Sequence, residues 1–145
     1  MRRLVLLVAA AFAFLLAGCE VGGPAVATPS SAPPSLEPFT ITRTGGFVDH
    51  DDTLEVDADG QWTYTSLTGP TSTGRFDSAA RTRLAGILAD ADLATQIAAM
   101  PSLGCCDLFS YELHISEDVY MFEDSGQLGS LVARLLDLLG EQTPF

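Results

Sequence analysis

Three cysteines are the side chains with the most distinctive chemistry in this 145-residue chain. Cys19 ends the string Leu16-Ala17-Gly18-Cys19. That string has the form of a lipobox, the pattern at which bacteria attach a diacylglycerol to the cysteine sulfur and then cleave the chain before it. The sequence therefore predicts lipidation at Cys19.

Cys105 and Cys106 are adjacent, and adjacent thiols in an oxidising compartment can close a strained vicinal disulfide. The alternatives are a redox switch or a soft-metal site. A metal site of this kind needs further ligands at fixed spacing, such as a second C-x-x-C, and the sequence has none. We favour a structural clip in the loop between Leu103 and Asp107.

The segment Gly45 to Asp52 places two apolar side chains beside three acids and a histidine. These oxygen ligands could hold a cation loosely, but they lack the spacing of a calcium loop. Phe47 and Val48 could instead serve as exposed anchors for a protein partner. A further interpretation, in which Phe47 tucks under the edge of a sheet, also stays open.

Bases suited to neutral pH are scarce, since the chain has only His50 and His114. No HExxH, G-x-S-x-G, Walker A or G-x-G-x-x-G string accompanies them. His114 alternates with Leu113 and Ile115 and is expected to point to solvent. We therefore predict a protein that is not an enzyme, with no cofactor and no metal of its own.

The first 18 residues have the parts of a secretory signal peptide. Arg2 and Arg3 precede an apolar run from Leu4 to Leu16, and small residues precede the cysteine. The run is too short for a transmembrane anchor, which takes roughly 20 residues. We expect the mature chain to be held by lipid at the extracytoplasmic face of the cell membrane.

Composition divides the rest of the chain into two parts. Residues 19–37 are rich in Pro, Ser, Ala and Gly without hydrophobic periodicity, which predicts a lipidated, disordered tether. Residues 38–145 have the length of one compact domain with its own core.

The mature chain that begins at Cys19 is strongly acidic. The formal net charge of −12 becomes −14 when Arg2 and Arg3 leave with the signal, and there is no lysine. Such a charge disfavours nucleic acids and anionic lipids, so membrane contact is expected through the lipid anchor only. It suits a basic protein partner or divalent cations, or it serves solubility alone.

Alternation of apolar and polar residues predicts strands at 39–43, 52–57, 61–66, 109–115 and 119–123, with a short one at 75–76. Asp59-Gly60 marks a tight turn, which places Trp62 and Tyr64 on one face of a hairpin.

Helical periodicity follows a cap at Asp77 or Ser78, and a further short helix is expected around Leu93 to Met100, ending at Pro101. A last amphipathic helix spans 128–139 and stops at Gly140. This order predicts an α+β domain, with an antiparallel β-sheet of four to five strands and helices packed on one face.

Short strings across the domain resemble the emfourin family, which are small protein inhibitors of protealysin-like, thermolysin-type zinc metalloproteases. The sharpest is R-x-G-G-F, formed by Arg43, Gly45, Gly46 and Phe47. Leu54 to Asp57, Phe109 to Leu113 and Val119 to Asp124 extend the similarity over most of residues 38–139.

The resemblance implies a non-catalytic inhibitor that plugs a protease cleft. Separately, we expect the chain to be a monomer. Such enzymes favour a bulky apolar side chain just past the scissile bond, and their zinc accepts a carboxylate, carbonyl or imidazole. Phe47 would then be the pocket anchor, and Asp49 or His50 would lie near the metal. The expected partner-binding residues are Gly45, Gly46, Phe47, Val48, Asp49 and His50.

Two other functions fit the same residues. One is an envelope lipoprotein that binds or scaffolds a different extracellular protein without inhibiting it. The other is a metal-handling lipoprotein that uses Cys105, Cys106 and the acidic segment.

Overall fold

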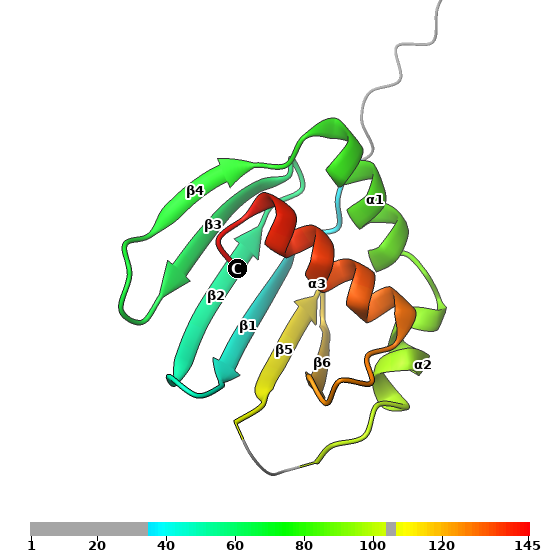
Figure 1. The fold of residues 1–145 in the computed structure, drawn as a ribbon. Helices are drawn as coiled ribbons and strands as arrows, with labels where there is room; N and C mark the ends of the chain where they lie inside the picture. Colours follow the sequence, from blue (N-terminus) through cyan, green and yellow to red (C-terminus); the bar gives the residue numbers. More distant parts are fainter. Residues whose placement is uncertain (1–34, 104–106) are drawn as a thin grey trace, which may run out of the picture. The chain divides into compact units, whose positions relative to one another are not determined.

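The structure, a computed structural model, describes residues 35–103 and 107–145 (Figure 1). The predicted signal peptide, Cys19, most of the tether and the Cys105-Cys106 pair lie outside the described residues. No helix in the described ranges has both the length and the apolar character needed to cross a membrane.

Six antiparallel strands and three helices make an α+β fold, which confirms the predicted class. The sheet has the order β4-β3-β2-β1-β5-β6, so β1 is central and pairs with β2 and β5. In chain order the elements are β1 Phe39–Gly45, β2 His50–Val56, β3 Gln61–Ser66, β4 Ser72–Arg75, α1 Ser78–Leu88, α2 Asp92–Ala98, β5 Phe109–Ile115, β6 Asp118–Glu123 and α3 Ser130–Gln142.

The predicted count of four to five strands is wrong by one, and the difference concerns the edge strand β4. The sequence placed a short strand at 75–76, whereas Ser72 to Arg75 pair with Gln61 to Tyr64 and Phe76 follows as a buried core residue. Gly74 in β4 leaves the space that the Trp62 ring occupies, because a Cβ there would lie 2.2 Å from Trp62 Cζ2. Because a glycine stands at this inward position, the sequence of β4 does not show the alternation of apolar and polar residues that marks a strand.

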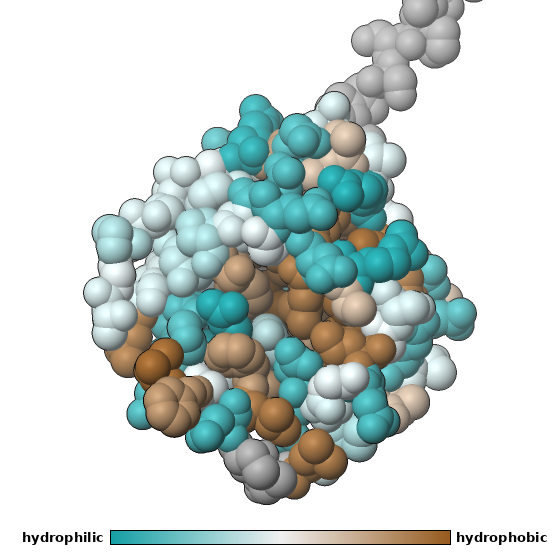
Figure 2. Space-filling model, viewed as in Figure 1, coloured by the Kyte–Doolittle hydropathy of each residue, from teal (hydrophilic) through white to brown (hydrophobic). Residues whose placement is uncertain are grey.

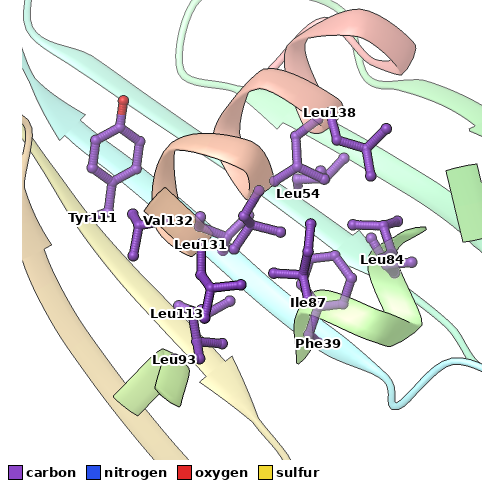
Figure 3. Packing of buried hydrophobic residues seen from close by; sticks show 14 of the residues in the cluster. Phe39, Leu54, Leu84, Ile87, Leu93, Tyr111, Leu113, Leu131, Val132 and Leu138 are labelled. Atoms are coloured by element: carbon purple, nitrogen blue, oxygen red, sulfur yellow. The ribbon is translucent and has the colours of Figure 1, made fainter. Parts of the chain in front are cut away.

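One face of the sheet is covered by the helices and the other is open. On β1 and β2, Phe39, Ile41 and Leu54 point into the core, while the threonines between them face outward. Figure 3 shows α3 bringing its apolar side chains over Leu54 and Leu113. Fully burying each such side chain contributes about 1.5 to 3 kcal/mol to folding.

The start of α1 agrees with the predicted cap, whereas the end of α3 does not agree with the predicted stop. Asp77 caps α1, since its Oδ1 accepts a hydrogen bond from the Ala80 N–H at 2.7 Å. The predicted stop of the last helix at Gly140 is wrong. Gly140 stays within α3, which ends at Gln142; the next residue, Thr143, is extended and donates its N–H to the Leu139 carbonyl.

The core begins before residue 38. Leu36, which the composition assigned to the tether, is only 3% exposed, and its N–H donates to the Ala58 carbonyl. Every core residue of the described ranges lies within the compact unit Ala32–Phe145. This unit therefore contains what a domain of its size needs to fold independently.

Candidate partner-binding site

The turn between β1 and β2 carries two of the most exposed large apolar side chains of the described residues. Phe47 is 88% exposed and Val48 is 70% exposed. In Figure 2 apolar atoms project at the lower left, where Figure 1 places this turn. The interpretation in which Phe47 tucks under the sheet edge is therefore wrong.

The connection is shorter than the sequence suggested. β1 continues through Gly45 and β2 begins at His50, so these two residues are a cross-strand pair. Only residues 46–49 form the turn, which the Asp49 N–H closes onto the Gly46 carbonyl at 3.4 Å. The apolar pair thus stands at the tip of a regular ladder, where little chain entropy is left to lose on binding.

Two glycines set the direction of this turn. Gly45 and Gly46 have φ angles of 89° and 73°, in the left-handed region that side chains disfavour. A Cβ on Gly45 would lie 2.6 Å from the Leu108 carbonyl oxygen, and one on Gly46 would lie 2.5 Å from the Phe109 ring. The Gly46 N–H also donates to the Leu108 carbonyl at 3.1 Å, so the turn is fixed against the start of β5.

A buried ion pair lies beneath the turn. Arg43 donates to Asp52 Oδ2 from Nε at 3.1 Å and from Nη2 at 2.5 Å, and Asp52 is 1% exposed. The Tyr64 hydroxyl donates to the other carboxylate oxygen at 3.0 Å, and His50 Nδ1 lies 3.1 Å from Oδ2. Side chains from three strands therefore meet at one carboxylate.

This environment holds Asp52 in its charged form. Burial alone would raise its pKa, but hydrogen bonds from Arg43, Ser66 and Tyr64, together with the charge of Arg43, outweigh that effect. The pKa of Asp52 falls from 3.8 to about 2. The carboxylate is thus ionised at every pH at which the domain would work.

Aromatic rings enclose the other side of Arg43. Its guanidinium carbon lies 5.2 Å from the centroid of Phe109 and 4.9 Å from that of Phe145, the C-terminal residue. Tyr111 packs against Phe145, and burial raises the pKa of Tyr111. The last residue of the chain therefore helps to brace the base of the turn.

The three acids and the histidine of this segment do not converge. Asp52 is buried against Arg43, Asp51 alternates to the open face, and Asp49 belongs to the turn with a φ of 49°. Across residues 35–103 and 107–145, no three potential ligands gather as a metal site would require. The loose cation site considered from the sequence is therefore not formed there.

His50 and Asp49 occupy different positions. The His50 ring sits at the base of the turn, bonded to Asp52 and edge-on to Phe109 at 5.3 Å between centroids. Its side chain is 34% exposed. Asp49 is exposed next to Val48, so it lies closer to the tip along the chain.

Sequence reasoning missed Leu67, which follows β3. Leu67 is 68% exposed, and its N–H donates to the Asp51 carbonyl at 3.0 Å. A hollow of about 190 Å³ is lined by both Val48 and Leu67. In the sequence, the feature that could have pointed to Leu67 is its position as a large apolar residue at the start of a loop rich in Gly, Pro, Thr and Ser.

The open face of the sheet carries a second hollow, of about 980 Å³, with Thr40, Glu55, Thr63 and His114 among its lining residues. His114 Nε2 lies 2.5 Å from Glu112 Oε1, and its side chain is 45% exposed. The predicted outward direction of His114 is therefore confirmed.

Comparisons with known proteins add nothing to this geometry. No protein-family model matches the chain, and no curated protein matches it significantly.

Proposed function

We propose that the chain is an extracytoplasmic lipoprotein, anchored by Cys19, whose domain inhibits a thermolysin- or protealysin-type zinc metalloprotease without catalysing a reaction. The observation that carries the proposal is the 88% exposure of Phe47 at the tip of a braced turn. The R-x-G-G-F string and its resemblance to the emfourin family supply the class of partner.

The energetics favour Phe47 as an anchor. Transfer of an exposed phenylalanine into an apolar pocket contributes about 1.5 to 3 kcal/mol. A preorganised loop keeps more of that energy than a mobile one, because less conformational entropy is lost on binding. The two glycines and the Arg43–Asp52 pair provide this preorganisation.

Asp49 suits the metal-facing role better than His50. A zinc ion in a protease cleft can accept a carboxylate oxygen as its fourth ligand. Asp49 is exposed beside the apolar tip, whereas the His50 ring lies at the base of the turn, edge-on to Phe109, with its side chain only 34% exposed. We therefore assign Asp49 to the zinc side of the cleft and His50 to support of the turn.

Titration of a thermolysin-type protease with the unit Ala32–Phe145 tests this function directly. We expect stoichiometric loss of peptide hydrolysis, with the zinc content of the protease unchanged. Full protease activity in the presence of excess folded domain, with folding checked by circular dichroism, would overturn the proposal. Binding without loss of activity would instead support the scaffolding function.

A further inference from the structure

Leu67 lies beside the β1–β2 turn but belongs to a different loop. We propose that Phe47, Val48, Asp49, Asp51 and Leu67 form one contact surface, the tip surface, and that it takes a protein whose apolar pocket is bordered by cationic side chains. This inference rests on the proposed function and extends its site from one turn to two loops.

The sheet brings the two loops together. β3 ends at Ser66, which pairs with Asp52, and the next residue continues that ladder by donating its N–H to the Asp51 carbonyl at 3.0 Å. The hollow of about 190 Å³ that Val48 and Leu67 share lies between the turn and the loop. A partner side chain that fills this hollow would contact both loops.

The apolar part of this surface consists of three strongly exposed side chains. Phe47, Val48 and Leu67 are 88%, 70% and 68% exposed. A group of exposed large apolar side chains on adjoining loops is a typical mark of a protein-binding site, whereas scattered ones are ordinary. Outside the tip surface the described residues also expose Met121 at 72% and Val119 at 53%, both on the edge strand β6, and Leu103 at 51%; Met121 provides a comparison.

Charge identifies the kind of partner. Asp49 and Asp51 are exposed at the border of the tip surface, while the charge of Arg43 below it is neutralised by Asp52. The other four arginines in the described part of the chain lie on β4, α1 and α3. The local field is therefore negative, which favours a cationic border around the partner's pocket and speeds association at low salt.

The experiment compares inhibition constants of four variants of Ala32–Phe145 at low and high salt. Leu67→Ala and Asp51→Asn alter the tip surface, and Met121→Ala and Glu117→Gln are matched controls elsewhere, each exposed. We expect about tenfold weaker inhibition for Leu67→Ala at both salt concentrations. Asp51→Asn should weaken inhibition about threefold at low salt only.

The outcomes separate this inference from the function on which it rests. If the unaltered domain inhibits and Phe47→Ala weakens inhibition, but Leu67→Ala and Asp51→Asn behave like their controls, the two-loop surface is wrong and the proposed function stands. If the unaltered domain does not inhibit at all, both are overturned. Thermal melting of each variant verifies that the fold is intact.

Discussion

Arg43 and Asp52 face each other across β1 and β2, with Nη2 of the arginine 2.5 Å from Oδ2 of the aspartate. Arg43 is the first residue of the R-x-G-G-F string and Phe47 is the last. The string therefore combines two roles. Its arginine and glycines fix the turn, and its phenylalanine is presented to solvent.

The Asp52 environment predicts a loss of stability in acid. Its pKa is about 2 in the folded domain against 3.8 for an unperturbed aspartate, so its contribution is complete above about pH 4 and disappears as the pH falls towards 2. The difference between these two pKa values corresponds to about 2 kcal/mol of folding free energy.

Urea unfolding between pH 5 and pH 2 measures this contribution. The free energy of unfolding should fall by about 2 kcal/mol more in the unaltered domain than in Asp52→Asn. The variant should already be less stable at neutral pH, because it leaves the Arg43 charge partly buried. Parallel pH profiles for the two proteins would show that Asp52 has no special part in acid stability.

Gly46 and Gly126 allow a controlled test of how the turn is held. Their φ angles are 73° and 74°, so alanine costs each about 1 kcal/mol in backbone strain. A Cβ on Gly46 also meets the Phe109 ring, whereas one on Gly126 meets nothing within 4 Å. The further decrease in the free energy of unfolding of Gly46→Ala, relative to Gly126→Ala, therefore measures the contact with the Phe109 ring.

We expect Gly46→Ala to lower the free energy of unfolding by at least about 1 kcal/mol more than Gly126→Ala. It should also weaken protease inhibition, because Phe109 supports both Arg43 and His50. Equal losses of stability in the two variants would mean that the ring moves away freely and that the turn is not fixed by this contact.

Much of the fold could be predicted from alternation. Phe109, Tyr111, Leu113 and Ile115 alternate without interruption, and β5 has the predicted bounds. β4 could not be found in this way, because the space at its inward position Gly74 is filled by Trp62 of the neighbouring strand β3. That contact depends on strand pairing, which a single sequence does not display.

The site was predictable only in part for the same reason. Phe47 and Val48 stood out as large apolar residues in a polar connection, and their exposure was one of two open interpretations. The burial of Asp52 follows from its pairing with Arg43, and this register requires knowledge that the turn has only four residues, 46–49. Leu67 joins the site through the same ladder.

Cys19→Ser tests the predicted anchor. The lipobox and the short apolar run predict that the lipid on Cys19 alone holds the mature chain at the membrane. The full-length variant should lose incorporation of labelled palmitate and leave the membrane fraction, while the unaltered chain stays there. Retention of the variant in the membrane fraction would contradict the lipoprotein assignment, whereas the domain's inhibitory function would be unaffected.

Phe47→Ala is the sharpest test of the anchor role, and Met121→Ala is its matched control. Both side chains are large, apolar and very exposed, at 88% and 72%, so neither truncation removes core packing. The free energy of unfolding should change by less than about 0.5 kcal/mol in each variant. Inhibition of a thermolysin-type protease should weaken by about 2 kcal/mol, or roughly thirtyfold, in Phe47→Ala only.

If Phe47→Ala weakens inhibition while its free energy of unfolding stays unchanged, the weaker inhibition does not come from a damaged fold. An equal weakening of inhibition by both truncations would indicate general hydrophobic adhesion rather than a specific pocket. If Phe47→Ala inhibits as well as the unaltered domain, Phe47 does not fill the pocket, and its assignment as the anchor is wrong.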